Sequence, residues 1–556
     1  MSVATFISRI LGYVRDMIVA GFFGATGTAD AFYVAFRVPN LLRELFAEGA
    51  TSSAFVPVLT EYQTKQGREE ANRLAGSMFL FIILFVGSLC ILGIIFAPAL
   101  VSLIAPGFLK DPEKMAHTVL LTRIMFPFLL FISLASLTMG ALNTRGVFFI
   151  PALAPAVLNI TTIICILALT HRLSNPIISV AIGVVAGGFV QLLFQIPSFF
   201  KQGYRFKGSN KLQVTSNSKD GNELRVPSNK LKTKDKDSSL VTDKVTRHSS
   251  RPFWHPGLKR IGLLIVPITA GLAIAQINIF ISTILASNLA EGSITYLYYA
   301  MRLIHFPIGI FGVAMGVAVL PALSEHSARG ERDKLKEDFS FALRLLFFIT
   351  VPAMVGLIAL RIPIVATLYQ RGRFGYAATI GTADALMFYS LGIWAMVGVR
   401  VIAATFYSMQ DTRTPVKIAA VTMVLNILLS FLLMGPMKHA GLAFANAIAS
   451  SCNFMLLFYF LRKKLGGIGA GKIFTSFAKT FSAAGIMGLS GWLVARGGAW
   501  TTDGHSLQKA GHLGGAIALC AGIYLLLSYL IKSEEMGYIL DKVRSRKLRQ
   551  VKTSEQ

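Results

Sequence analysis

Long apolar runs separated by short polar turns fill almost the whole chain. A helix that spans a membrane needs about 20 mainly apolar residues. Fourteen runs meet that length, with ends good to about four residues: 2–25, 29–62, 76–104, 117–141, 150–171, 175–200, 258–287, 293–322, 338–360, 376–408, 415–435, 440–463, 472–495 and 509–532. The pattern predicts an all-α polytopic membrane protein with about 14 transmembrane helices.

An internal repeat divides these runs into two sets. At an offset near 264–268, residues 35–37, 54–61 and 143–145 are echoed by residues 300–302, 318–325 and 411–413. Six helices is an even number, so the two copies insert with the same orientation and a pseudo-two-fold axis lies along the membrane normal. The predicted parts are two six-helix lobes (1–200 and 258–465), a basic loop (201–257), two extra transmembrane helices (466–533) and a basic tail (534–556).

Composition supports lipid as the solvent of this chain. Of the 556 residues 54% are apolar and 15% are charged, whereas soluble domains average about 25% charged residues. No room is left for a large soluble catalytic domain. The net charge of +27 has two candidate causes: the excess of Lys and Arg in cytoplasmic loops, and cations that line the pathway of an anion. Loop charges favour both termini in the cytoplasm.

The segment 201–257 differs from the rest of the chain. It is rich in Lys, Ser, Asn and Asp and has almost no apolar cluster, so we expect a disordered cytoplasmic loop. Its Lys and Arg excess has two interpretations, contact with anionic lipid headgroups or a solvated linker. The second is favoured because it needs only the ordinary bias of inside loops.

The first two runs hold an unusual number of charges: Arg9, Arg15, Asp16, Asp30, Arg37, Arg43, Glu44 and Glu48. A charge at the centre of a membrane helix costs about 2.5–3.5 kcal/mol. These side chains must therefore face water, each other or a ligand. At 100° per residue, Asp30, Arg37 and Glu44 share one stripe with Glu48, so acids and a base can pair along it. Arg43 lies off that stripe and points elsewhere.

Arg302 occupies the matching helix of the second copy, with no acid within one turn on either side. An unpaired arginine at depth is costly unless it binds an anion. We therefore interpret Arg15, Arg43 and Arg302 as ligand contacts. Asp16, Asp30 and Glu48 are interpreted as structural partners or gate ion pairs rather than as ligand contacts. Arg9 either extends to the membrane surface or joins the gate, and His305 is expected to be a packed residue.

Several other chemistries are excluded. The Gly-rich stretch 466–473 resembles a phosphate-binding loop, but Ile473 replaces the Ser or Thr that holds magnesium and no strand precedes it. The cysteines lie singly in apolar runs and are expected to be small buried hydrophobes. No cleavable signal peptide is expected, because Arg9, Arg15 and Asp16 interrupt the first run. We expect no cofactor, with the energy supplied by the membrane potential or a coupling ion.

Specific motifs also resemble a known family, the MurJ (MviN) lipid II flippases of the multidrug/oligosaccharidyl-lipid/polysaccharide exporter superfamily. The residues that carry the resemblance are Ser8-Arg9-Ile-Leu-Gly12-Tyr-Val-Arg15-Asp16, Ala29-Asp30-Ala31-Phe32, Pro39-Asn40-Leu-Leu-Arg43, Phe46-Ala47-Glu48-Gly49, Phe55-Val-Pro57, Tyr298-Tyr-Ala-Met-Arg302, Gln370-Arg-Gly372-Arg-Phe374 and Asp411-Thr-Arg413-Thr-Pro415. The likeness spans nearly the whole chain and is most specific in its first sixty residues.

The resemblance implies a multi-pass protein of the bacterial inner membrane that exports lipid II for peptidoglycan synthesis, cell wall biogenesis and cell shape. Lipid II is undecaprenyl-pyrophosphate-linked disaccharide-pentapeptide. The resemblance further implies a cationic cluster of Arg15, Arg43 and Arg302, and a groove for the lipid tail in 466–533. It implies gate or supporting roles for Arg9, Asp16, Asp30, Arg37, Asn40 and Glu48. Expected partners are lipid II, membrane lipids and proteins of cell-wall synthesis, without nucleic acid.

Two departures from the family pattern stand out. Met301 replaces the Asp that often precedes the second-lobe arginine, and the basic insertion 201–257 is longer than usual. The alternative function is a flippase for another polyprenyl-pyrophosphate-linked glycan. A cationic-drug exporter would show acids without excess arginine, and a membrane-embedded enzyme would need paired carboxylates with a metal or a large loop domain. We therefore expect a transporter and not an enzyme.

Overall fold

The computed structural model describes residues 2–45, 52–204, 255–497, 500–502, 504 and 506–541. Within these ranges the regular elements are helices, as the apolar runs predicted. In the first half they are α1 (Ser2–Phe23), α2 (Gly27–Leu42), α3 (Ser52–Lys65), α4 (Arg68–Ile95), α5 (Ala97–Ile104), η2 (Pro106–Lys110), α6 (Pro112–Thr144), α7 (Phe149–Leu169) and α8 (Ile178–Lys201).

The second half follows the same order. Its helices are α9 (Pro256–Ser287), α10 (Ser293–Pro307), the π-helix η3 (Ile308–Gly312), α11 (Val313–Ala328), α12 (Arg332–Ala359), α13 (Arg361–Tyr369), α14 (Tyr376–Ser390), α15 (Ile393–Ser408) and α16 (Arg413–Leu465). Two further helices, α17 (Ala470–Val494) and α18 (Ser506–Leu530), end the bundle.

Within the described residues, each of the predicted spans coincides with one or more helices. Eight helical stretches of the described residues are long and apolar enough to cross a membrane by themselves. Several spans that the sequence predicted as single helices are broken: 293–322 consists of α10, η3 and α11, and 376–408 consists of α14 and α15. Conversely, α16 contains two predicted spans that meet at a kink, where Lys438 has φ 52°.

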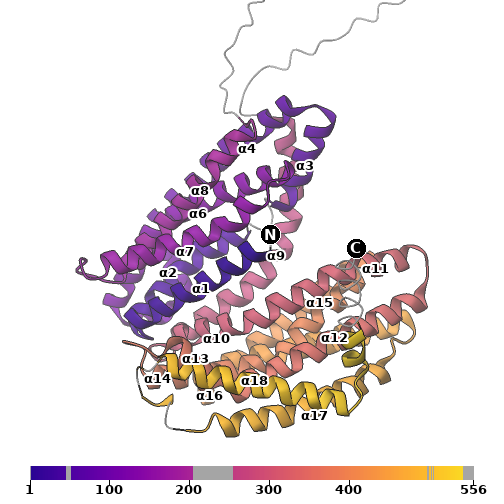
Figure 1. Ribbon diagram of the computed structural model, residues 1–556. Coiled ribbons are helices and arrows are strands. Elements are labelled where there is room, and N and C mark those ends of the chain that lie inside the picture. The colour runs from indigo at the N-terminus through magenta and orange to yellow at the C-terminus, as the bar shows by residue number, and fades with distance from the viewer. Residues whose placement is uncertain are drawn as a thin grey trace, which may run out of the picture.

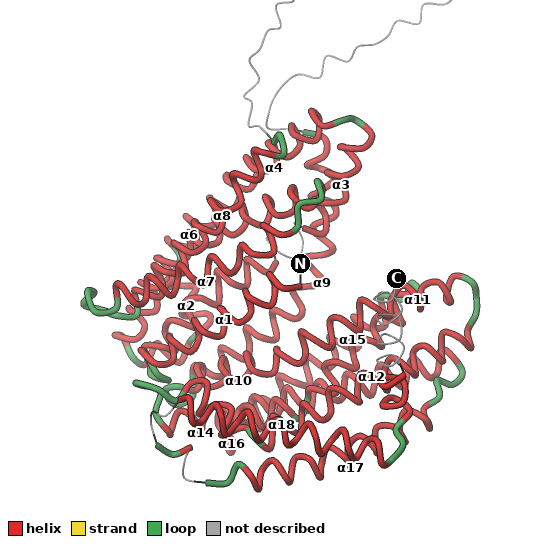
Figure 2. Tube along the Cα trace, in the orientation of Figure 1, coloured by secondary structure: helices red, strands yellow, loops and turns green. Residues whose placement is uncertain are grey.

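The two halves meet at one end and diverge toward the other (Figures 1 and 2). The end at which they meet, here called the closed end, carries the turns 24–26, 288–292 and 370–375. The opposite end, the open end, carries the turns 66–67, 145–148, 329–331 and 409–412. Helices α17 and α18 lie on the second half, with α17 on the side away from the first half (Figure 1). The predicted architecture of two six-span lobes plus two helices is confirmed.

Helix α9 ties the halves together along their length. Near its start, Leu258 and Ile261 pack in the apolar core of the first half around Leu74. The His255 ring accepts the backbone N–H of Gly257 and so caps the helix start, and its Nε2 lies 3.0 Å from Oε1 of Glu70 in α4. Farther along α9, Asn426 of α16 in the second half donates to Asn278 at 2.6 Å. This helix therefore belongs to both packing units.

Both halves contain a short π-helical turn at the matching point of the repeat. Residues 43–45 follow α2, and Ile308–Gly312 follows α10. Single π turns inside helical segments occur often at functional sites. These turns lie on the two helices that carry Arg43 and Arg302, so the local backbone around the predicted cluster is irregular in both halves.

Candidate functional site

Three charged side chains meet where α1 faces α10. Asp16 accepts hydrogen bonds from Nη2 and Nε of Arg15 at 2.7 and 3.1 Å. Its second oxygen lies 2.9 Å from Nε of Arg302. The Asp16 side chain is 3% exposed, whereas that of Arg302 is 37% exposed. One buried carboxylate is thus shared by two guanidinium groups, and this triad keeps one net positive charge.

The sequence analysis left Arg302 without a partner, and that interpretation was wrong. It considered only acids within one turn on the same helix, whereas the partner Asp16 comes from the other half of the molecule. The pairing is incomplete, because the Nε of Arg302 and the facing oxygen of Asp16 are not aligned as a hydrogen bond. Arg302 is therefore held by charge while its outer nitrogens stay accessible.

Two residues of α1 shape the approach of Arg302. A methyl group added at Gly12 would lie 2.7 Å from Nη2 of Arg302, so only glycine leaves room for the guanidinium there. The hydroxyl of Tyr13 donates to the backbone carbonyl of Arg302 at 3.1 Å, and the guanidinium lies 5.4 Å from the centre of the Tyr13 ring. Together these contacts fix the position of Arg302 in the seam, the surface along which α1 and α2 of the first half face α10 of the second.

The predicted Arg43 lies at the end of α2, in a polar group of its own. Its Nε donates to Oδ1 of Asn40 at 3.1 Å, and Nη2 lies 3.7 Å from Glu44. Asn40 in turn donates to Glu44 at 3.1 Å, and Gln276 of α9 also donates to that carboxylate. The structure therefore does not place Arg43 in the triad. It lies nearer the open end, one to two turns beyond Arg37.

The predicted pairing of acids with Arg37 along one stripe of α2 is not observed. Among the described residues Arg37 forms no ion pair, and Tyr298, Tyr389 and Glu44 are its electrostatic neighbours. Asp30 instead bonds to the start of α10. Glu48, predicted to be a gate or supporting residue, lies outside the described residues.

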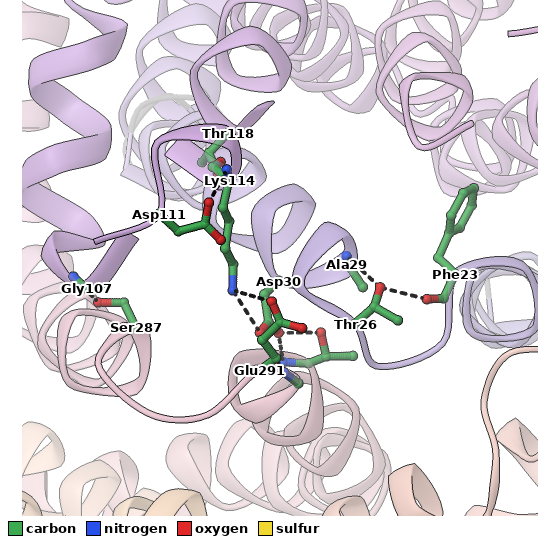
Figure 3. A network of polar contacts seen from close by, with 12 residues as sticks. Phe23, Thr26, Ala29, Asp30, Gly107, Asp111, Lys114, Thr118, Ser287 and Glu291 are labelled. Atoms are coloured by element: carbon green, nitrogen blue, oxygen red, sulfur yellow. Dashed lines mark hydrogen bonds and ion pairs between the residues drawn. The ribbon is translucent and has the colours of Figure 1, made fainter. Parts of the chain in front are cut away.

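Asp30 joins the halves at the closed end (Figure 3). Its carboxylate accepts the backbone N–H groups of Gly292 and Thr295 at 2.7 and 2.9 Å and the Thr295 hydroxyl at 2.7 Å. It therefore caps the start of α10, where the free N–H groups and the helix dipole favour a negative charge. Lys114 of α6 lies 3.9 Å from both Asp30 and Glu291.

Close backbone contacts also hold the closed end together. The N–H of Arg373 donates to the carbonyl of Gly21 at 2.9 Å. Gly24 has φ +63°, and a methyl group there would meet the carbonyl of Arg373 at 2.5 Å. The hairpin between α13 and α14 can therefore approach the end of α1 this closely only because residue 24 is a glycine.

An aromatic layer separates the triad from the closed end. Tyr33 of α2 donates to the hydroxyl of Tyr299 of α10 at 2.9 Å, and its ring stacks on Tyr298 with centroids 4.0 Å apart. Tyr299 also packs on Tyr369, with centroids 4.5 Å apart. Tyr299 and Tyr369 are fully buried. Tyr33, Tyr298 and Tyr299 thus pack between the triad and the Asp30 contacts of the closed end.

A cavity of about 320 Å³ lies apart from this seam, within the second half. Its lining includes Asn278, Asn426, Asn446 and Asn453 and contains no charged side chain among the described residues. This volume suits a small molecule at most. A large anionic headgroup fits neither its size nor its uncharged lining, so the arginine-bearing seam is the better candidate site.

Arg400 was missed by the sequence analysis. It lies in α15, where its exposed side chain borders Gly312 and Gly316 of the second half. The signal that singled out Arg302 was present here also, since Arg400 is a lone cation deep in the run 376–408. Lys114 and Thr295 at the closed end had no comparable signal, because Asp30 reaches them only through the fold.

These features define a class: an all-helical membrane protein of two repeated halves with a charged seam between them. The fold is similar to that of a multidrug resistance MATE family transporter of the MOP superfamily in an inward-facing conformation. That structure has a TM-score of 0.62 and 15% identity over 84% of this chain and 95% of the transporter. At this identity the likeness shows the fold alone.

The chain belongs to the MurJ family. The family model described as "Lipid II flippase MurJ" matches residues 19–502. A Burkholderia cenocepacia protein described as "Lipid II flippase MurJ" is 34% identical over 460 residues, 83% of this chain and 82% of the relative. A Vibrio cholerae protein, "Probable lipid II flippase MurJ", is 33% identical over 96% of this chain and 95% of its own length. A structure titled "Lipid II flippase MurJ, inward closed conformation" has a TM-score of 0.73 and 27% identity, covering 95% of this chain and 98% of that one.

Proposed function

We propose that this protein moves lipid II from the cytoplasmic to the periplasmic leaflet of the bacterial inner membrane by alternating access. The observation that carries the proposal is the triad, in which two arginines from opposite halves share one buried carboxylate. The uncompensated positive charge calls for an anion, and guanidinium groups match phosphate oxygens with two parallel hydrogen bonds. Family membership supports lipid II as the source of that diphosphate.

In this proposal Arg15 and Arg302 bind the diphosphate, and Arg43 meets it on the way from the open end. The open end faces the cytoplasm with both termini, because most basic loops lie there. Asp16 keeps the two arginines from repelling each other while the site is empty. Asp30, with Lys114 and Thr295, forms the gate that shuts the periplasmic side. Arg9, Arg37 and Asn40 support α1 and α2, which carry Arg15 and Arg43.

The lipid tail stays in the bilayer while the headgroup crosses. Helices α17 and α18 expose large apolar side chains such as Phe474, Leu489 and Leu526, which suits a role in holding that tail. Outward movement of negative charge is favoured by about 2.3 kcal/mol per charge per 100 mV of inside-negative potential. The potential is therefore the proposed source of energy, with a coupling ion as the alternative.

The test is translocation of fluorescent lipid II in proteoliposomes, with and without an imposed potential. Arg43→Ala and Arg302→Ala are expected to abolish translocation while leaving purification and thermal unfolding close to normal. Arg462→Gln, an exposed arginine at the end of α16, is the matched control and keeps full activity. Normal translocation by both alanine variants would refute the arginine cluster. Accumulation of a different lipid-linked glycan on depletion of the protein would refute the substrate.

A further inference from the structure

A second group of cations lies beside the π-helix η3, on the open-end side of the triad. Arg9 reaches this turn from α1: a methyl group added at Gly309 would lie 3.3 Å from its Nη1 and 3.5 Å from its Nη2. Arg400 reaches it from α15: a methyl group at Gly312 would lie 3.4 Å from its Cδ. Gly309 and Gly312 lie three residues apart in the same short turn, so arginine side chains from both halves border one segment.

Charge near this turn is not balanced by acids. Neither Arg9 nor Arg400 forms an ion pair with any residue that the structure describes, and both are exposed. His305 lies one turn before η3, and its Nδ1 is hydrogen-bonded to the carbonyl oxygen of Met301 at 2.7 Å. Glu44 is the acid that acts on His305 electrostatically, and it is already bonded to Asn40 and Gln276.

In the triad, Asp16 offsets part of the charge. The guanidinium groups of Arg9 and Arg400 have no such acid partner among the described residues. Both side chains are exposed, so an anion can reach them. The Arg9 guanidinium reaches across from α1 to the backbone of the other half at Gly309. The arrangement therefore indicates a ligand with an anionic group in this position.

We propose that Arg9 and Arg400 form a second anion subsite, which binds a carboxylate of the peptide stem of the substrate. The proposal rests on the proposed function, which places the diphosphate at Arg15 and Arg302. Gly309 lies about two helical turns after Arg302 along α10 and η3, so the proposal assigns the two positions to different anionic groups of one substrate. The remaining negative charges of lipid II are the carboxylates of its pentapeptide, and a guanidinium fork fits a carboxylate bidentately.

The glycines of η3 are part of this subsite. Gly309 gives the Arg9 guanidinium a flat backbone surface to lie on, and Gly312 does the same for the aliphatic part of Arg400. The π turn displaces the backbone at this point, which leaves the two side chains room to approach a common ligand from opposite halves.

The test measures binding to the purified full-length protein with two probes, lipid II and undecaprenyl diphosphate, which lacks sugar and peptide. Arg400→Gln is expected to weaken lipid II binding on the order of tenfold and to leave undecaprenyl diphosphate binding unchanged. Arg400→Lys retains the charge and is expected to recover part of the loss. Arg9→Gln repeats the test from α1, and Arg462→Gln is the exposed control.

Equal weakening of both probes by Arg400→Gln would overturn the proposal, because the subsite would then contact the diphosphate. Unchanged binding of both probes by Arg400→Gln and Arg9→Gln would overturn it as well. Arg302→Gln tests the proposed function separately, and it is expected to weaken the binding of both probes. Unchanged binding of both probes by Arg302→Gln would refute the diphosphate site at the triad, whatever the result at Arg400.

Discussion

At the scale of single residues, the seam shows how much of a charged site depends on small neighbours. The sequence predicted that Arg15 and Arg302 lie deep, from the cost of charge in a membrane helix. It did not predict that Asp16 serves both, because that contact crosses the halves. Gly12 carried no signal at all, since a glycine within an apolar run has many explanations. Only the structure shows that the Arg302 guanidinium occupies the space beside it.

Replacement of Gly12 by Ala tests this positioning role. The added methyl would lie 2.7 Å from Nη2 of Arg302, the far end of a flexible chain, so the helix remains intact while the guanidinium moves away from Asp16. We expect lipid II translocation to fall on the order of tenfold or more, without loss of thermal stability, because Ala favours a helix over Gly by about 1 kcal/mol.

The matched control is Gly87→Ala in α4, where an added methyl meets nothing within 4 Å. That variant should translocate normally and unfold at the same or a slightly higher temperature. A fully active Gly12→Ala protein would show that the position of Arg302 tolerates displacement, and the positioning role would be wrong.

At the scale of elements, the apolar runs located the helices but not their breaks. Length and apolar content define a span, and eight helical stretches of the described residues meet both criteria. The break at η3 and the kink at Lys438 depend on packing between helices, which leaves no periodic signal. The dual attachment of α9 is of the same kind: its residues read as one apolar run, and only its neighbours show that its start packs in the first half.

The cap that Asp30 places on α10 is the contact that we propose holds the closed end shut. Asp30→Asn removes the charge and at least one of three hydrogen bonds, and bonds to a charged group contribute about 1.5–3 kcal/mol each. We expect the closed end to open more often. A cysteine at Ala300, which is fully buried in α10, should then react with a polar thiol reagent roughly tenfold faster or more.

Thr295→Val provides a graded comparison, since it removes only the hydroxyl bond to Asp30. Its effect on the same labelling rate should be smaller, in keeping with about 0.5–1.5 kcal/mol for one ordinary hydrogen bond. Identical labelling rates in wild type and both variants would contradict the gate role of Asp30.

The turn before α16 makes a prediction about pH. Asp411 accepts hydrogen bonds from the N–H and the hydroxyl of Thr414. Its carboxylate also lies 2.6 Å from Nζ of Lys464, in the last turn of α16. The ion pair with Lys464 lowers the pKa of Asp411 to about 2 from an ordinary 3.8. A carboxyl group whose pKa is lower in the folded than in the unfolded state stabilises the fold at every pH above its unfolded pKa. That stabilisation is lost as the pH falls from about 4 through 2.

Asp411→Ala should therefore lower the unfolding temperature at pH 7, where loss of a helix cap costs about 1 kcal/mol. The difference from wild type should shrink as the pH is lowered through the same range, measured by thermal unfolding in detergent. Asp411→Asn keeps the capping oxygen and should lose less. A difference that stays constant from pH 7 to pH 2 would show that the charge of Asp411 contributes nothing.

At the scale of the whole molecule, the closed end is the part that must open if the halves alternate. Its contacts include the Asp30 cap, the aromatic layer, and the approach of the α13–α14 hairpin to α1. Halves that rotate as packed bodies can break such a set without changing their own interiors. Transport should therefore stop when one covalent bond joins the halves here.

A disulfide between positions 21 and 371 supplies that bond. The β-carbon of a residue at Gly21 would lie 3.1 Å from Cγ of Arg371, close to the roughly 3 Å that a disulfide leaves between a β-carbon and the opposite sulfur. We expect the Gly21→Cys, Arg371→Cys double variant to bind lipid II from the open end but not to translocate it when oxidised. Reduction should restore translocation, and each single variant should be active under both conditions. Undiminished translocation by the oxidised, cross-linked protein would mean that the substrate does not pass between the halves, because a route through the seam requires this contact to separate in every cycle.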